Sequence, residues 1–125
     1  MNLKLNKSQI KRFSRQIILK SIGAAGQKKI IQSKVLIIGM GGLGCPVAEF
    51  LTRAGVGTLG IIDNDKVDLS NIHRQSLYNV SDIAISKVLC AKKKLKKIHS
   101  KTNVVCHKIR INENNFSKIM KNYDY

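Results

Sequence analysis

The chain has 125 residues, 43% of them hydrophobic, which suits one globular domain. No apolar run approaches the roughly 20 residues of a membrane span, and the basic start lacks the apolar segment of a secretory signal. We therefore expect a cytoplasmic protein with no membrane partner.

Lysine and arginine number 23 against 7 acidic residues, a net charge of +16. This balance favours nucleic acid, nucleotides or an acidic protein as partners. The abundance of Lys, Asn and Ile is also what an AT-rich coding sequence produces, and no aromatic residues alternate with the lysines of residues 92–97. We interpret these lysines as a solvated helix face and do not expect a nucleic-acid partner.

The three cysteines and three histidines show neither a Cys-x-x-Cys pair nor another metal-ligand spacing. We interpret Cys45, Cys90 and Cys106 as structural thiols, and no residue is assigned as a metal ligand.

A helical segment is predicted at the start of the chain. Asn6 and Gln9 form a capping-box pattern, and Ile10, Phe13, Ile17 and Ile18 recur at helical spacing. These positions predict an amphipathic helix over residues 7–20. Gly-Ala-Ala-Gly at 23–26 interrupts the pattern, and a second short helix is expected over 27–33.

The next stretch combines a strand, a glycine turn and a helix. Residues 35–38 form an apolar, β-branched run that is typical of a strand buried on both faces. It leads into Gly39-x-Gly41-x-x-Gly44, whose glycines, with Gly42, allow a tight turn and close approach to a phosphate at the next helix N-terminus. We expect that helix to end at Gly55. Its predicted buried face consists of Val47, Ala48, Leu51 and Ala54.

A second buried strand is predicted over residues 58–62, ending at Asp63. Asp63 follows the glycine turn by about 20 residues, as does the acid that binds a ribose hydroxyl in dinucleotide-binding folds. The alternative is that Asp63 only caps the turn formed with Asn64 and Asp65.

The rest of the chain continues the alternation of strands and helices. After a polar stretch over 65–75, we predict a helix over 84–99 with Val88, Ala91, Leu95 and Ile98 inward, a strand over 103–111 and a short helix. Residues 123–125 have the character of a lead-in to a further strand. The pattern predicts an α/β fold with a mostly parallel, Rossmann-like sheet and helices on both faces. We divide the chain into an N-terminal helical segment, 1–33, and a Rossmann-like ATP-binding domain, 34–125.

Five motifs, taken in order, resemble the N-terminal half of the ThiF/MoeB/HesA family, the bacterial relatives of ubiquitin-activating enzymes. They occupy residues 12–19, 39–45, 54–57, 62–65 and 69–75. The resemblance extends from about residue 10 to the end of the chain. It implies ATP and Mg²⁺ as cofactors, and adenylation of the C-terminal glycine of a ubiquitin-like sulfur carrier in thiamine or molybdopterin biosynthesis.

The resemblance also implies roles for individual residues. The glycine turn and Asp63 would hold the nucleotide, and Arg15 would reach into the partner subunit's site of a homodimer. Arg74, Lys87 and Arg15 would supply catalytic positive charge at the phosphates. The expected cofactor-binding residues are Gly39, Gly41, Gly42, Gly44, Asp63, Asp65, Ser70, Asn71, Arg74, Gln75 and Lys87.

Two departures from the family pattern stand out. The family lysine usually follows a Gly-x-Pro sequence, whereas Ala84-Ile85-Ser86 precedes Lys87 here. The family's magnesium-binding aspartate belongs to an Asp-x-x-Asp-Asn segment that this sequence does not contain, and Asp124 is not assigned to that role. We therefore expect a fold that is incomplete relative to the family, with weak or absent catalysis by this chain alone.

Three alternatives remain open at this point. The chain could be a nucleotide-binding or dimerisation module without catalysis, or part of a family dehydratase that activates a tRNA-borne carboxylate. At the level of the fold it could be a nicotinamide-dependent dehydrogenase. The polar sequence of residues 70–75 argues against the last.

Overall fold

The computed structural model describes residues 3–125, so residues 1 and 2 of the predicted N-terminal segment lie outside it. Within the described range, no helix is both long enough and apolar enough to cross a membrane. The elements follow in the order α1 (Lys7–Arg12), α2 (Ser14–Ile17), α3 (Gly23–Gln32), β1 (Lys34–Ile38), α4 (Gly44–Ala54), β2 (Thr58–Ile62), η1 (Leu69–Asn71), η2 (Val80–Asp82), α5 (Lys87–Ile98), β3 (Asn103–His107) and α6 (Glu113–Met120).

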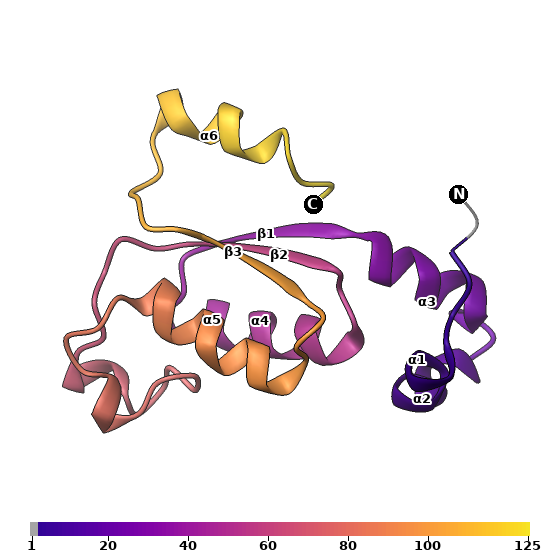
Figure 1. Cartoon of the computed structure of the whole chain (residues 1–125). Helices are drawn as coiled ribbons and strands as arrows, with labels where there is room; N and C mark the ends of the chain where they lie inside the picture. Colours follow the sequence, from indigo (N-terminus) through magenta and orange to yellow (C-terminus); the bar gives the residue numbers. More distant parts are fainter. Residues whose placement is uncertain (1–2) are drawn as a thin grey trace.

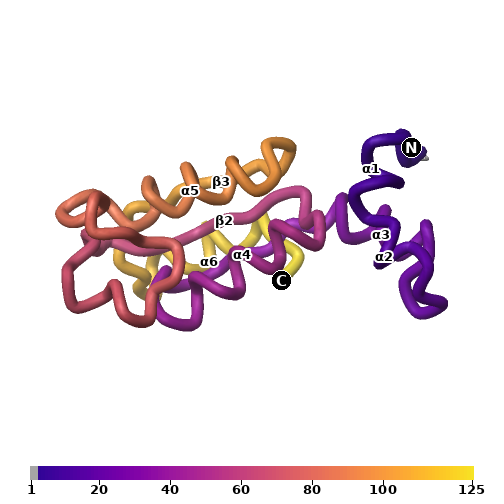
Figure 2. Tube along the Cα trace, turned by 90° about the horizontal axis from the view of Figure 1, so that it is seen from below, coloured from indigo at the N-terminus to yellow at the C-terminus, as the bar shows by residue number. Residues whose placement is uncertain are grey.

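The three strands form one parallel sheet in the order β1-β2-β3, with Lys34 opposite Thr58 and Thr58 opposite Asn103. All three carboxyl ends therefore meet at one edge of the sheet. Helices α4 and α5 cover one face, and α6 lies over the other (Figure 1). Seen from below, α4 and α5 run along the sheet, and the N-terminal helices lie beyond one end of it (Figure 2). The predicted α/β fold, with a parallel sheet and helices on both faces, is confirmed.

The core lies between the sheet and the pair α4 and α5. Leu59 and Ile61 of β2 are fully buried there, and the predicted inward face of α5 is confirmed because Val88, Ala91 and Leu95 are buried and Ile98 is partly so. The prediction for α4 is wrong at Val47, which is 47% exposed. The buried residues of α4 are Gly44, Cys45, Ala48 and Thr52. Close packing of Gly44 against the Gly39 carbonyl fixes this rotation of the helix, since a side chain at 44 would overlap that oxygen.

The second face of the sheet is covered by α6 and the residues after it. The Tyr123 ring lies over Gly60 of β2, where any side chain would collide with it. The Tyr123 hydroxyl also forms a hydrogen bond with His107 Nε2 of β3, at 2.9 Å. The predicted strand over 103–111 is too long, because β2 offers a partner to β3 only as far as Ile62, opposite His107.

β1 lies at an edge of the sheet, so the prediction that this strand is buried on both faces is wrong at Ile38, which is 54% exposed. The last residues of the chain lie along the side of β1 that faces away from β2. Leu36 N–H donates to the Tyr125 carbonyl at 2.9 Å, and Asp124 N–H donates to the Lys34 carbonyl at 2.8 Å. This pairing agrees with the expected lead-in to a strand.

The N-terminal segment differs most from its prediction. The capping box of Asn6 and Gln9 is present, but the helix breaks at Phe13 into α1 and α2. Phe13 is 2% exposed and packs against Gly55, whereas Ile10 and Ile18 of the expected apolar face are exposed. The break lets this ring reach the C-terminus of α4. Residues 23–26 do not interrupt a helix, since they form the first turn of α3.

Helix α5 begins at Lys87 rather than at residue 84. The preceding residues form an antiparallel bridge between Lys66 and Ser86, and Ala84 has a φ of 71°. A right-handed helix needs a φ of about −60°, so α5 does not extend back through Ala84.

Candidate functional site

The predicted glycine turn joins β1 to α4 at the carboxyl edge of the sheet, the edge at which open α/β folds bind ligands. Gly39 has a φ of 90°, which favours glycine, and nothing within 4 Å would meet a side chain there. The expected sequence of strand, turn and helix is therefore present.

The turn offers a row of amide groups without partners. Within residues 3–125, the N–H groups of Gly41, Gly42 and Leu43 donate no hydrogen bond. Helix α4 begins immediately afterwards, at Gly44, so the positive end of its dipole adds to these donors. Such an arrangement suits a phosphate group.

Asp63 connects the turn to the end of β2. Its Oδ2 atom accepts a hydrogen bond from Met40 N–H at 2.8 Å, and its Oδ1 atom accepts one from Asp65 N–H at 2.8 Å. The turn-capping alternative is thus realised in the structure. It does not exclude a ligand, because each carboxylate oxygen keeps further acceptor capacity. The ribose role of Asp63 stays a prediction.

The polar loop places two of its residues directly against the turn. The aliphatic part of the Arg74 side chain lies where a side chain at position 42 would just touch it, and Arg74 Nη1 donates to the Ser70 carbonyl at 2.9 Å. The Gln75 amide lies where a side chain at position 41 would touch it. Gln75 is 4% exposed, and its Oε1 atom has no hydrogen-bond partner among the described residues. An exposed guanidinium and a buried amide therefore border the free amides of the turn.

Ser70 and Asn71 have local structural tasks. Ser70 donates from its N–H and from its hydroxyl to Asp68 Oδ2, and Asn71 Oδ1 accepts from Asp68 N–H at 2.9 Å. The bonds from Ser70 lower the pKa of the exposed Asp68 carboxyl. These contacts cap η1 and fix the loop that carries Arg74. A direct contact of Ser70 or Asn71 with a nucleotide stays a prediction.

Lys87 is a buried cation in an electrostatically unfavourable place. It is the first residue of α5, its side chain is 7% exposed, and its Nζ lies 4.0 Å from Asp65 Oδ2. A positive charge at a helix N-terminus opposes the helix dipole. The Asp65 carboxylate is the ion-pair partner of this lysine, and a bound anion would be a second one.

The departure from the Gly-x-Pro pattern before Lys87 has a structural counterpart. Ala84 occupies the position of the family glycine and has the positive φ that a glycine would adopt easily. Ser86 occupies the proline position with a φ of −53°, close to the value that proline fixes. The backbone leading to Lys87 thus has a conformation compatible with Gly-x-Pro, although the side chains differ.

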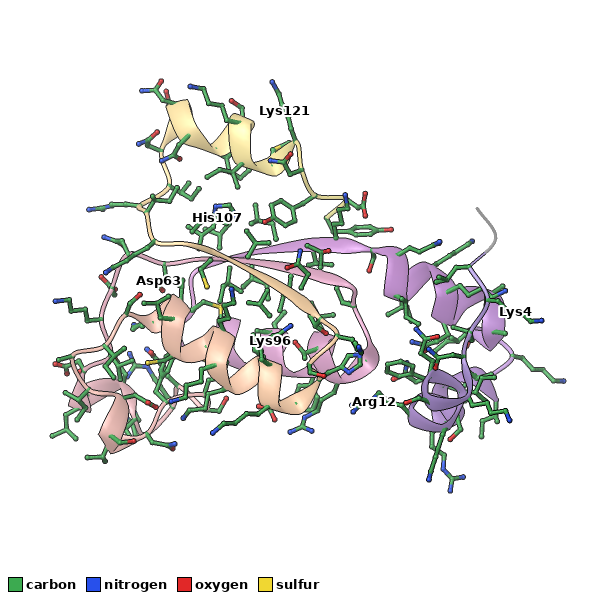
Figure 3. All side chains as sticks on the ribbon, in the orientation of Figure 1. Lys4, Arg12, Asp63, Lys96, His107 and Lys121 are labelled. Atoms are coloured by element: carbon green, nitrogen blue, oxygen red, sulfur yellow. The ribbon has the colours of Figure 1, made fainter. Side chains whose placement is uncertain are left out.

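Arg15 lies away from all the other predicted site residues. It is on α2, beyond the end of the sheet opposite the glycine turn. In Figure 3 the labelled Arg12 lies on the N-terminal helices and the labelled Asp63 at the other end of the sheet. Its neighbours in sequence have contacts inside the chain. Arg12 donates to the Ile98 carbonyl at 3.2 Å, and Gln16 donates to the Ala54 carbonyl at 3.0 Å. Arg15 is exposed, and its guanidinium has no partner within residues 3–125.

Two hollows flank Gly39. One, of about 210 Å³, is lined by Asp63, Asp65 and the loop after β3 at residues 109–111. The other, of about 440 Å³, is lined by the glycine turn, Ile38 and Val47. A further recess, of about 400 Å³, lies beside Phe13 and His99 at the opposite end of the sheet.

Sequence reasoning missed one buried group at the turn. Tyr78, 3% exposed, donates from its hydroxyl to the Met40 carbonyl at 2.7 Å. A tyrosine beside Leu77 at the end of a polar loop was the available signal. The three cysteines are free thiols, and burial raises the pKa of each, in agreement with a structural interpretation.

Comparisons with known proteins bear directly on this site. The model of the ThiF family matches residues 13–125. The adenylyltransferase and sulfurtransferase MOCS3 of Aedes aegypti is 43% identical over 121 residues, covering 97% of this chain and 28% of the relative. The protein of the same name from Drosophila willistoni is 45% identical over 120 residues, covering 96% of this chain and 26% of the relative.

Solved structures give the same fold. PaaA matches with a TM-score of 0.88 and 31% identity, covering 98% of this chain and 41% of that one. E. coli MccB with ATP matches with a TM-score of 0.79 and 32% identity, covering 92% and 35%. The E. coli tRNA N6-threonylcarbamoyladenosine dehydratase TcdA, in complex with AMP, matches with a TM-score of 0.89 at 21% identity, covering 98% and 49%. This chain spans only about a quarter to a half of the length of these proteins.

Proposed function

The chain belongs to the ThiF family, and on this premise we propose that it binds ATP at the β1–α4 turn and takes part in activating a carboxylate by adenylyl transfer. The observation that carries the proposal is the row of free amides at Gly41, Gly42 and Leu43, set between the Asp63 carboxylate and the Arg74 side chain. An anion fits the amides, and a ribose hydroxyl fits the carboxylate.

Each site residue has a task in this proposal. The amides of the turn bind phosphate oxygens, while Asp63, held by Met40 N–H, accepts from a ribose hydroxyl. Arg74 and Lys87 bring positive charge from the loop and from the start of α5. The unpaired Gln75 Oε1 is available to a donor on the ligand or a bound water.

The reaction joins two anions. An oxygen of the substrate carboxylate forms a bond to the α-phosphorus of ATP, the bond from that phosphorus to the oxygen bridging to the β-phosphate breaks, and pyrophosphate leaves. Cationic side chains and backbone amides that are already in place lower the barrier, because they need not reorganise as charge builds up. Lys87 is suited to this task because burial restricts its motion.

For the substrate we propose the C-terminal glycine of a ubiquitin-like sulfur carrier. The support is the family resemblance, together with the similarity to MOCS3 proteins, which are named adenylyltransferases and sulfurtransferases. The ATP in the MccB structure, at 32% identity, supports the choice of nucleotide. The similarity to TcdA, at 21% identity, supports only the fold.

Arg15 fits a homodimer in which it reaches the site of the partner subunit. The support is the contrast with Arg12, Phe13 and Gln16, which all have contacts within the chain. A cation without an intrachain partner is available to a phosphate from another copy.

Magnesium is the second cofactor of the proposal. Between residues 3 and 125, no group of three His, Cys, Asp or Glu side chains is placed to hold a metal ion. At nucleotide sites Mg²⁺ is commonly held by one or two carboxylates together with the phosphates and water, so the ion would bind with the nucleotide. Weak or absent turnover by this chain alone stays an expectation, which the exchange assay below measures.

Titration calorimetry tests the proposal. We expect wild-type chain to bind ATP, and Asp63→Ala to lose most of the affinity. Glu49→Ala is the matched control, because the Glu49 carboxylate forms its ion pair with Arg53 one turn along α4 rather than with the glycine turn. Tight binding of NADH without binding of ATP would contradict the proposal, and ATP–pyrophosphate exchange with a sulfur carrier measures the catalytic part separately.

A further inference from the structure

The peptide group between Met40 and Gly41 is fixed by hydrogen bonds from buried side chains. The Met40 carbonyl accepts a hydrogen bond from the Tyr78 hydroxyl at 2.7 Å and a weaker one from the Cys45 thiol at 3.6 Å. Met40 and Cys45 are fully buried and Tyr78 nearly so. Water therefore has little access to this carbonyl, and the two side chains satisfy it in place of water.

The orientation of this carbonyl determines where the next amide points. In a planar trans peptide, the C=O and N–H groups point in opposite directions. With its carbonyl directed inward at Tyr78, the peptide directs the Gly41 N–H away from the core. That N–H is one of the free amides of the turn.

The peptide on the other side of Met40 is held as well. Met40 N–H donates to Asp63 Oδ2, and the carbonyl of Gly39 lies against Gly44. Because Gly39 and Gly41 lack a Cβ, each of these two peptides has a less restricted backbone on its glycine side than on its Met40 side. The hydrogen bonds that Tyr78 and Cys45 donate to the Met40 carbonyl, and the one that Met40 N–H donates to Asp63, therefore add the restraint that the glycines do not supply.

We propose that Tyr78 is a positioning residue, which directs the Gly41 amide at the bound phosphate by holding the Met40 carbonyl. The inference rests on the proposed function, since it concerns the same nucleotide site. Burial raises the pKa of Tyr78, so the phenol stays protonated and remains a donor at all physiological pH values. Cys45 is a second donor to the same oxygen, and burial likewise keeps it a neutral thiol.

Tyr78→Phe removes only the hydroxyl and tests this role. Tyr123→Phe is the matched control: it removes the hydroxyl that bonds to His107 on the far face of the sheet, away from the turn. In the ligand-free chain, we expect the Gly41 amide resonance to broaden or double in Tyr78→Phe, as the peptide samples two orientations, and to stay single in Tyr123→Phe. We expect ATP affinity to fall about tenfold in Tyr78→Phe and to stay within twofold of wild type in Tyr123→Phe, at a temperature where both are folded.

The outcomes separate the inference from the proposed function. A single, sharp Gly41 resonance in Tyr78→Phe would overturn the inference, as would a disturbed Gly41 peptide with unchanged ATP affinity. If Tyr78→Phe does not fold, Cys45→Ala gives the same readouts with smaller expected effects, and the same results would overturn it. A wild-type chain that binds no ATP would contradict the proposed function, while the Gly41 resonance would still decide whether Tyr78 orients this peptide.

Discussion

Lys87 Nζ lies 4.0 Å from Asp65 Oδ2, and the Lys87 N–H donates to the Asp65 carbonyl at 3.0 Å. The carboxylate is largely exposed, whereas the ammonium is buried. This pair links the start of α5 to the end of β2, next to the glycine turn.

We expect Lys87→Met to stabilise the fold and weaken nucleotide binding. Methionine fills similar space without a buried charge at the positive end of α5, so the free energy of unfolding should rise by about 0.5–1 kcal/mol in urea denaturation. ATP affinity should fall about tenfold or more. Lys92→Met, on the exposed face of the same helix, is the control and should change neither quantity appreciably. A Lys87→Met variant that is less stable and binds ATP normally would show that the lysine serves the fold instead.

Ala84→Gly should stabilise the protein. The left-handed conformation of Ala84 strains a residue with a Cβ, and glycine removes that strain at some cost in chain entropy. We expect a net gain of about 0.5–1 kcal/mol in the free energy of unfolding. Ala25→Gly, the same change inside α3, should instead lose up to about 1 kcal/mol. Equal losses in both variants would mean that the Ala84 backbone is not strained.

Phe13→Ala should undock the N-terminal helices from the end of α4. The ring is 2% exposed, lies against Gly55 and meets His99 edge to face at 5.8 Å. Loss of a buried phenylalanine costs about 3–5 kcal/mol. Ile18→Ala, at a site 69% exposed, should cost less than about 0.5 kcal/mol. Similar losses of stability in the two variants would contradict this packing of Phe13. They would support the single amphipathic helix predicted over residues 7–20.

His99 should make stability depend on pH. Partial burial, with Arg12, Lys96 and Lys101 nearby, lowers the pKa of His99 in the folded state. The folded protein therefore favours the neutral ring, and its contribution to stability is complete above the unfolded pKa of about 6.5 and declines as the pH falls below it. Urea denaturation between pH 8 and 5 should show this decline in wild type and a smaller one in His99→Asn. A free energy of unfolding that rises as the pH falls from 8 to 5 would mean that folding raises the pKa of His99 instead of lowering it.

The elements that sequence predicted well are those whose boundaries are set locally. Gly39 and Gly55 bracket α4, and the apolar run before Asp63 defines β2. The predictions fail where contacts between residues far apart in the sequence determine the structure. Phe13 breaks its helix to reach Gly55, and Val47 is exposed because Gly44 packing sets the rotation of α4.

In the candidate site, too, locally determined features were predictable and those set by distant contacts were not. The turn and Asp63 were predictable from their spacing, since it repeats the strand, turn and acid of nucleotide-binding folds. Tyr78 was not predictable, because its partner is a backbone carbonyl far away in sequence, and a carbonyl has no sequence signature. The left-handed Ala84 was hidden for a similar reason, since alanine gives no sign of a positive φ.

Amide chemical shifts during an ATP titration test the central claim most directly. We predict that the resonances of Gly41, Gly42 and Leu43 move on addition of ATP, while those of Gly23 and Gly26 in α3 do not. Asp63→Ala should abolish the movement. Shifts confined to the lysine-rich face of α5 at residues 92–97, or no shifts at all, would contradict a nucleotide site at the β1–α4 turn.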